Sequence, residues 1–230
     1  MAKRLRFDRG VGLKDFRSVV PMQAIAEINA ALDSLPGNVS QRPHPDTVAK
    51  MLRRGDAFRQ LEEAVCADTR AMVAGVVQGT LRQEPVHVIR CADPVRRRDS
   101  HCRHYDSHLL TMLIPLRLAP DCACNGDLIM YRCPRLTVST LGNVMCKIAH
   151  GIHRKLPFVW RKWLTLRDLR RGHCSRVPVQ LGSVYVFNGF ALKHANIDVE
   201  MGQRRSLLIH YYDPGHSLGL SWLMRRVRGV

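Results

Sequence analysis

The sequence lacks a long apolar run and has little acidic charge. No stretch approaches the roughly 20 apolar residues that a membrane-spanning helix needs, and the basic N-terminus is not followed by the apolar core of a signal peptide. We therefore expect a cytoplasmic protein with no transmembrane segment. Acidic residues number 19 against 36 Lys and Arg, which gives a formal net charge of +17. This imbalance predicts an anionic partner or substrate.

The eight cysteines lack the dense spacing of a secreted disulfide scaffold. Cys122 and Cys124, with Cys133 and Cys102, are a rival set of thiolate ligands for zinc. Structural zinc sites usually contain two close ligand pairs, and here only one close pair exists, separated by a single residue. Reduced cysteines that pack in the interior are the favoured interpretation.

The chain of 230 residues, with 46% apolar and 24% charged residues, has the composition of one folded domain. Apolar residues recur at helical spacing over 21–34, before the stop signal Pro36-Gly37, and again from Asp46 to Val73 with an interruption at Gly55. We interpret residues 1–83 as helical support, 84–214 as a β core and 215–230 as a basic tail.

The core is predicted to be β-sheet, which makes the fold α+β with a mainly β centre. Segments rich in Val, Ile, Leu and Tyr stand between turn signals at 86–89, 109–116, 128–131, 183–187 and 205–212. Asn125-Gly126 and Asn188-Gly189 are typical turn pairs. Residues 134–181 are too long for a plain loop, so we predict an insertion there with helices of its own.

A candidate metal site begins at His104-Tyr105-Asp106, directly before the strand predicted at 109–116. On an extended segment the side chains of residues i and i+2 share a face, so His104 and Asp106 can offer a nitrogen and an oxygen to one ion. His194 follows the strand predicted at 183–187 and is the third candidate. Two histidines and one carboxylate leave open positions on a metal, as in non-haem Fe(II) oxygenases.

The order and spacing of these residues resemble the Fe(II)- and 2-oxoglutarate-dependent dioxygenase superfamily over about residues 84–214. The resemblance includes His104-x-Asp106, the distant His194, and Arg204 ten residues beyond it in the pattern Arg204-x-Ser206. It implies a double-stranded β-helix, also called a jelly-roll or cupin-like fold. His104, Asp106 and His194 would then be the catalytic metal ligands, and Arg204 and Ser206 would bind the cosubstrate.

The resemblance implies Fe(II), 2-oxoglutarate and O2 as cofactor and cosubstrates, and hydroxylation of an unactivated C–H bond with release of succinate and CO2. A guanidinium such as that of Arg204 can make two parallel hydrogen bonds to a carboxylate, which suits the distal end of 2-oxoglutarate. Because Asp106 is a carboxylate, hydroxylation is favoured over halogenation. Desaturation and cyclisation stay open.

Neighbouring residues offer other assignments within the same site. Arg205 could compete for the cosubstrate, although strand alternation places it on the face opposite Arg204. Thr111 and Tyr131 could add a cosubstrate hydrogen bond. His101 and His108 flank the motif, so a shifted set of metal ligands is conceivable, but neither pairs as simply with Asp106 as His104 does.

The predicted insertion carries the densest positive charge of the chain. Between Lys147 and Arg176 nine Lys and Arg residues alternate with apolar and Trp residues, and Asp168 is the only acid. This pattern is typical of segments that lie on anionic lipid. We expect a substrate-facing lid, an anionic or lipid-linked substrate and peripheral contact with the inner membrane face; a solvated basic face is the plainer interpretation. The basic segment 221–228 has the same character.

Other functions are compatible with the same residues. Nucleic acid is a less favoured partner, because aromatic residues make up only 6% of the chain and no dedicated nucleic-acid motif is present. A non-catalytic β-sandwich that binds anionic lipid or nucleic acid is one alternative function. A cupin-like metal protein that does not use 2-oxoglutarate is another.

Overall fold

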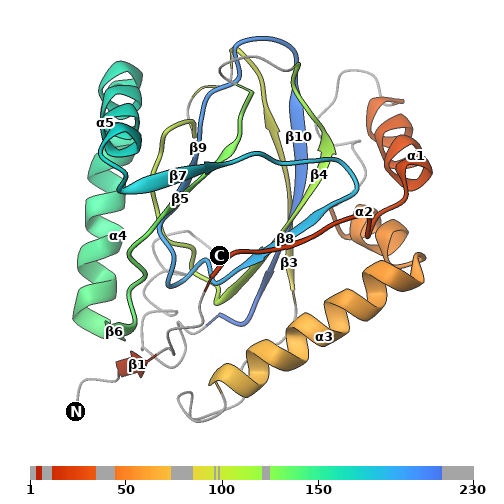
Figure 1. The fold of residues 1–230 in the computed structure, drawn as a ribbon, viewed down its shortest axis with the longest axis horizontal. Coiled ribbons are helices and arrows are strands. Elements are labelled where there is room, and N and C mark those ends of the chain that lie inside the picture. The colour runs from red at the N-terminus through yellow and green to blue at the C-terminus, as the bar shows by residue number, and fades with distance from the viewer. Residues whose placement is uncertain are drawn as a thin grey trace, which may run out of the picture.

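The computed structural model describes residues 4–6, 12–34, 45–73, 85–95, 97, 99–120 and 125–213. Two antiparallel sheets lie at the centre, with helices on both outer sides (Figure 1). The helices are α1 (Met22–Asp33), α2 (Pro45–Leu52), α3 (Asp56–Val73), α4 (Thr140–Lys155) and α5 (Phe158–Arg170).

The larger sheet contains five strands in the order β2-β8-β4-β10-β3. Their bounds are β2 (Lys14–Phe16), β8 (Val184–Phe187), β4 (Leu110–Arg117), β10 (Arg204–Tyr211) and β3 (Val86–Ala92). Residues 110–116 of β4 and all of β10 are buried. A strand covered on both faces has no alternation of apolar and polar residues, which explains the continuous apolar run at 109–116.

The smaller sheet contains β7 (Cys174–Val177), β5 (Leu128–Tyr131) and β9 (His194–Asn196), in that order. A short ribbon of β1 (Arg4–Arg6) and β6 (Thr137–Ser139) lies apart from it. The main apolar core contains side chains from both sheets, for example Ile114 and Leu207 of the larger sheet and Leu128 of the smaller one. The two sheets therefore face each other across a shared interior.

The N-terminal helices cover the outer side of the larger sheet (Figure 1). Ile25, Ile28 and Leu32 of α1 are buried at helical spacing, as the sequence predicts. Arg205 of β10 fixes α1 to the sheet, because its Nη1 donates to Asn29 Oδ1 (3.0 Å) and its Nη2 to Asp33 Oδ1 (2.8 Å). These helices support the sheet, and none of their described side chains belongs to the site described below.

The predicted insertion at 134–181 contains α4 and α5, and also a core strand that the sequence did not reveal. β7 pairs antiparallel with β5 along its whole length, so residues 174–177 belong to the smaller sheet. Its sequence, Cys-Ser-Arg-Val, has only two apolar residues, which is too short a pattern to predict a strand. Ser139 caps α4 by accepting from Gly142 N, and Pro157 precedes α5, as is common at helix starts.

Several predicted features fall outside the described residues: the stop at Pro36-Gly37, the basic tail 215–230, and Cys122 and Cys124 of the rival zinc site. The cysteines within the described ranges are all free thiols, but only Cys102 and Cys174 are buried and Cys133 is exposed, so the expected interior packing holds for only part of the set. No described helix is long and apolar enough to cross a bilayer.

Candidate active site

The structure brings His104, Asp106 and His194 together between the two sheets, as the sequence predicts. The backbones of His104 and His194 pair as an isolated bridge, each N–H donating to the other's carbonyl at 2.9 and 3.0 Å. The Nε2 atoms of both histidines lie 3.5 Å from Asp106 Oδ1. One ligand atom from each residue lies within 4.8 Å of the others, so all three can bind one cation.

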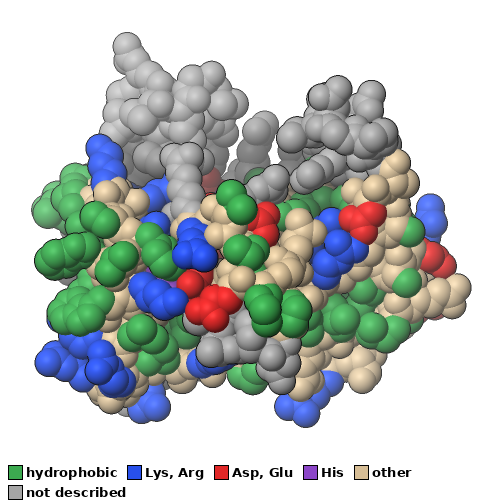
Figure 2. Space-filling view, turned by 90° about the horizontal axis from the view of Figure 1, so that it is seen from above, with side chains coloured by type: hydrophobic (Ala, Val, Ile, Leu, Met, Phe, Trp, Pro, Cys, Tyr) green, Lys and Arg blue, Asp and Glu red, His purple; other side chains and the backbone are tan. Residues whose placement is uncertain are grey.

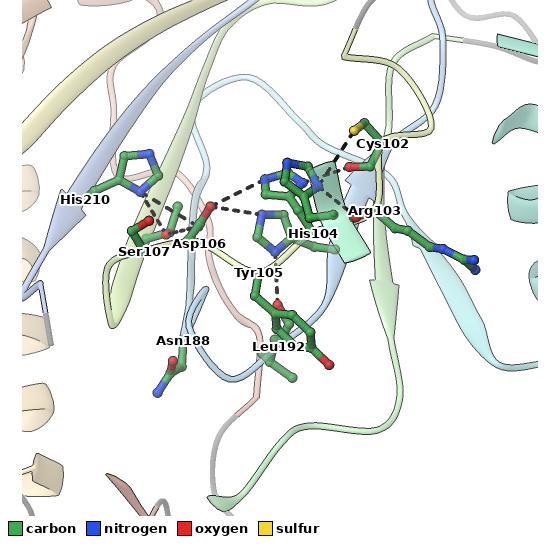
Figure 3. A network of polar contacts seen from close by, with 12 residues as sticks. Cys102, Arg103, His104, Tyr105, Asp106, Ser107, Asn188, Leu192 and His210 are labelled. Atoms are coloured by element: carbon green, nitrogen blue, oxygen red, sulfur yellow. Dashed lines mark hydrogen bonds and ion pairs between the residues drawn. The ribbon is translucent and has the colours of Figure 1, made fainter. Parts of the chain in front are cut away.

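Both imidazoles are held in the orientation that a metal ligand needs (Figure 3). Nδ1 of His104 lies 2.8 Å from the carbonyl oxygen of Cys102, and Nδ1 of His194 lies 3.1 Å from that of Leu192. A carbonyl can only accept, so each Nδ1 donates and each Nε2 keeps its lone pair for the centre. Carbonyl oxygens in this role are common around protein-bound metals.

The carboxylate of Asp106 is held from its other side. The hydroxyl of Thr111 donates to Oδ2 at 2.5 Å, and the same hydroxyl lies 3.0 Å from His210 Nδ1. The backbone N–H of Asp106 donates to Gly189 O at 2.8 Å. A Cβ on residue 189 would lie 2.1 Å from Asp106 Oδ2, so only glycine fits beside this carboxylate.

The carboxylate of Asp106 supplies the negative charge of this centre. Burial raises the pKa of Asp106, but His194, His104 and His210 lower it, and the net result is a pKa well below 3.8. Burial lowers the pKa of His104 below 6.5 and that of His210 to about 4. Two imidazole nitrogens and one carboxylate oxygen suit a divalent transition metal better than Mg²⁺ or Ca²⁺, which prefer oxygen ligands.

Arg204 is a buried cation without an anionic partner. It lies on β10 with 5% of its surface exposed, and its Nη1 donates to Gly126 O, at the end of the smaller sheet. Its Nε has no hydrogen-bond partner among the described residues, and no described carboxylate forms an ion pair with it. Burial lowers the pKa of Arg204 to about 10. A buried guanidinium without an anionic partner lowers the free energy of unfolding, and binding of an anionic ligand would offset that loss.

Ser206 and Arg90 extend this polar region. Ser206 Oγ is buried and also has no partner among the described residues. Arg90 of β3 stands opposite Ser206 in the register of the sheet, so the two side chains share a face. The charge of Asp127 raises the pKa of Arg204 and that of Arg90 lowers it, both less than burial does. Asp127 Oδ2 accepts from Arg176 Nε at 2.6 Å, so no described carboxylate forms an ion pair with Arg204.

Gly126 makes room for Arg204. Its φ is +82°, a conformation that glycine adopts without strain, and a Cβ there would lie 2.8 Å from Arg204 Cδ. The sequence identified Asn125-Gly126 only as a turn. In the structure the same glycine also lets the long arginine side chain pack between the sheets.

The alternative assignments are placed elsewhere by the structure. Arg205 points to α1, as alternation predicts. The hydroxyl of Tyr131 donates to Asp168 (3.1 Å), while that of Thr111 serves Asp106. His101 pairs with Asp198, Nε2 to Oδ1 at 3.0 Å, and His108 stacks on His210. Among the described residues, the set formed by His104, Asp106 and His194 is the one group able to hold a metal.

Helix α4 lies beside the centre. Lys147 Nζ donates to the backbone oxygen of Tyr105 (3.3 Å) and to Ser107 Oγ (3.0 Å). The ring of His150 lies 5.3 Å from that of His104. The inner face of α4 therefore lies against the candidate metal site.

Sequence reasoning missed three contributors to the site. Gly189 was identified as part of a turn, and its close approach to Asp106 depends on how two distant loops meet. His210 and Arg90 lie on strands that the sequence predicted, but nothing in their local sequence separates them from ordinary strand residues. Strand register alone brings them to the site, with His210 opposite Thr111 and Arg90 opposite Ser206.

The comparisons with known proteins support the fold. EvdO2 from Micromonospora carbonacea var. aurantiaca, solved in complex with 2-oxoglutarate, matches with a TM-score of 0.51 and 15% identity, covering 89% of this chain and 87% of that one. A Pseudomonas putida prolyl-4-hydroxylase matches with a TM-score of 0.48 and 12% identity over 88% of this chain and 89% of that chain. No family model matches the sequence. No curated protein matches it either. At these identities the likeness to EvdO2 establishes the fold, a double-stranded β-helix, which confirms the predicted fold class.

Proposed function

We propose that this protein is an Fe(II)- and 2-oxoglutarate-dependent oxygenase that hydroxylates an unactivated C–H bond. The observation that carries the proposal is the pairing of two unlike sites between the same two sheets. One is a converging set of two imidazoles and a carboxylate. The other is a buried, unpaired guanidinium with an unpaired hydroxyl two residues away, Arg204 and Ser206.

Separate residues are assigned to the metal and to the cosubstrate. His104, Asp106 and His194 would hold Fe(II). Arg204 would bind the distal carboxylate of 2-oxoglutarate through its guanidinium, and the Ser206 hydroxyl would add a further donor. When bound, the iron supplies the oxidising chemistry with O2 and 2-oxoglutarate, which releases succinate and CO2. The two sheets keep bulk water away from both groups.

We infer further that the substrate is anionic or lipid-linked. Arg135 lies between the rings of Tyr105 (4.0 Å) and Phe190 (4.6 Å), and its buried Nη2 has no partner among the described residues. Lys193 lies over the rings of Tyr105 (5.9 Å) and Tyr131 (5.1 Å). No described carboxylate pairs with either cation. Both are close in sequence or space to the candidate metal ligands, so an anionic substrate group would find positive charge beside the centre.

An anaerobic titration tests the cofactor assignment. The Fe(II)-loaded protein is titrated with 2-oxoglutarate while the weak visible charge-transfer band of the chelate is recorded. We expect a band in the wild type, no band in His194→Ala, and a band in Arg204→Ala only at much higher 2-oxoglutarate. His173→Ala and Arg205→Gln are matched controls, because His173 is exposed and Arg205 faces α1; both should keep the band.

The alternatives predict different results. A wild type that binds iron stoichiometrically but gives no band would overturn the use of 2-oxoglutarate and favour a cupin-like metal protein. A wild type that binds no iron would favour a non-catalytic binding module. With the band established, succinate release is then measured with anionic and lipid-linked candidate substrates and with neutral analogues of each.

A further inference from the structure

Exposed apolar side chains gather on helices α4 and α5. Of the twelve large hydrophobic residues of the described chain that are exposed, eight lie on these two helices, with exposed fractions from 42% to 72%. They are Leu141, Met145, Ile148, Ile152, Val159, Trp160, Trp163 and Leu166, which we name the α4–α5 surface. Figure 2 shows hydrophobic and basic side chains together at the end of the molecule where Figure 1 places these helices. Isolated exposed hydrophobics need no explanation, but a concentration of this kind marks an interaction site.

The apolar residues of α4 form one narrow stripe. Leu141, Met145, Ile148 and Ile152 follow one another at steps of four, three and four residues, which keeps them on a single helix face. Lys147 and His150 lie on the opposite face, where they contact the candidate active site. The inner face of α4 is thus polar and packed against the protein, and its outer face is apolar and exposed.

Helix α5 repeats the arrangement. Val159, Trp163 and Leu166 share an outward face, with Trp160 at its edge. On its inward face the buried Asp168 accepts from Arg103 (2.8 Å) and from Tyr131 (3.1 Å). The inward face is therefore polar and fixed to the core. The outward face is apolar and exposed, the reverse of an ordinary surface helix.

Basic residues outnumber acidic ones on these helices. Residues 140–171 contain eight Lys and Arg and one acid, Asp168, which is buried, while Arg154 pairs with Asp99 and Lys162 with Asp198 and Glu200. Lys155, Arg170 and Arg171 are exposed at the ends of the two helices. Apolar and Trp side chains surrounded by basic residues are the composition of helices that lie in the interface of an anionic bilayer.

We propose that the α4–α5 surface docks the protein on an anionic lipid bilayer, with the eight apolar side chains in the interface and the flanking Lys and Arg at the headgroups. A second copy of the chain is disfavoured because a twofold contact through this surface would bring like charges together. Nucleic acid is disfavoured because Leu, Ile and Met side chains gain nothing from phosphates or from base stacking.

Docking would place the candidate active site next to the lipid. The inner face of α4 contacts the site and its outer face would contact the bilayer, so about 10 Å, one helix diameter, would separate the two. The docking itself stands apart from the proposed oxygenase activity. Only its consequence, access to a substrate held at the membrane surface, rests on that activity.

Vesicle flotation with the metal-free full chain tests the proposal without any catalytic readout. We expect binding to vesicles of phosphatidylglycerol and phosphatidylcholine, weak binding to phosphatidylcholine alone, and a loss on addition of salt. The variant Ile148→Ser/Ile152→Ser/Trp160→Ser/Trp163→Ser should bind at least about tenfold more weakly. Met22→Ser/Met201→Ser is the matched control, because it removes two exposed hydrophobics elsewhere, and should bind as the wild type does.

A second variant addresses the charge. Replacing Lys155, Arg170 and Arg171 by Gln should weaken binding to the anionic vesicles by about fivefold per residue, or about a hundredfold together. Circular dichroism verifies that both variants fold. In a Trp222→Phe background the emission of Trp160 and Trp163 should shift to the blue on adding anionic vesicles and not on adding neutral ones.

Three results would overturn the proposal. The first is no binding of the wild type to anionic vesicles. The second is undiminished binding by the folded apolar-to-serine variant. The third is a concentration-dependent dimer, or a complex with an oligonucleotide, that is lost in the apolar-to-serine variant while vesicle binding is not. A dimer would assign the α4–α5 surface to a second copy of the chain, and an oligonucleotide complex would assign it to nucleic acid.

Discussion

The two ends of the candidate active site differ in how their polar atoms are satisfied. At the His104, Asp106 and His194 end, the atoms that face away from the centre are all engaged, by the carbonyls of Cys102 and Leu192 and by the hydroxyl of Thr111. At the Arg204 end, buried donors stand without partners.

The difference shows what each end requires. A metal centre needs its ligands oriented in advance, because small misplacements of the ligand atoms weaken metal binding. A binding site for a carboxylate needs donors that nothing else in the protein occupies. The partnered and the unpartnered atoms are therefore both consistent with a site built to receive a metal at one end and an anion at the other.

The largest expected effect, on Fe(II) binding, comes from removing a ligand at the His104, Asp106 and His194 end. Asp106→Ala removes the one anionic ligand and leaves two neutral imidazoles, so we expect Fe(II) binding to be lost, as measured by anaerobic calorimetry. Asp56→Asn changes an exposed carboxylate on α3 and should leave the affinity unchanged. Retention of wild-type affinity by Asp106→Ala would show that the cation binds elsewhere.

Substitution of Arg204 should weaken the binding of 2-oxoglutarate and leave the binding of Fe(II) unchanged. Arg204→Met removes the guanidinium but keeps an unbranched apolar chain, so 2-oxoglutarate should bind about a hundredfold more weakly while Fe(II) affinity is unchanged. Because a buried unpaired charge is costly, the ligand-free variant should be at least as stable as the wild type. Binding isotherms and urea unfolding measure the two effects. A variant that loses both ligands equally, or that is much less stable, would contradict the separation of the two ends.

The same contrast marks what the sequence could and could not predict. His104 and Asp106 were predictable because strand geometry alone puts residues i and i+2 on one face. Arg204 was separated from Arg205 by the same alternation, which the structure confirms through the contacts of Arg205 with α1. The contacts of Gly189 with Asp106 could not be predicted, because they depend on the packing of segments more than eighty residues apart.

The predicted elements show the same limit. Long apolar strands such as 110–117 were predicted almost to the residue, since seven consecutive buried positions leave a clear signal. The strand at 174–177 was missed, because two exposed polar residues at its centre give it no apolar run. The outward stripe of α4 was visible as apolar content, but only the packed structure shows that it faces away from the core.

Gly189→Ala tests whether the oriented end depends on close packing. The added Cβ would lie 2.1 Å from Asp106 Oδ2 and 2.7 Å from Thr111 Oγ1. The Asp106 carboxylate and the Thr111 hydroxyl must therefore both move away from the new methyl group. We expect Fe(II) to bind about 10 to 100-fold more weakly, with 2-oxoglutarate affinity falling only as far as it depends on the metal. Gly151→Ala is the matched control, because a Cβ there meets nothing within 4 Å. Equal affinities in the two variants would show that the carboxylate position is not critical.

The smallest expected effect concerns His153, a buried histidine outside the site that can be compared with Arg204. His153 of α4 is buried, and neither ring nitrogen has a hydrogen-bond partner among the described residues, as at Arg204. Here, however, burial lowers the pKa to about 4, so the ring is neutral at pH 7 and needs no counter-ion. An unpartnered buried atom of an ionisable side chain thus indicates an ionic ligand only where the group keeps its charge.

Acid unfolding tests this distinction. In the unfolded chain the ring of His153 binds a proton near pH 6.5, whereas in the folded chain it does so only near 4. Its contribution is complete above pH 6.5 and falls as the pH decreases toward 4, by about 1 kcal/mol at about pH 5.5. His153→Leu should therefore lose less unfolding free energy than the wild type between pH 7 and 5.5, as measured by urea unfolding. His173→Leu, which changes an exposed histidine, should show the wild-type loss. Identical pH dependence in His153→Leu and the wild type would mean that the folded ring binds its proton at the same pH as the unfolded one, and the contrast with Arg204 would fail.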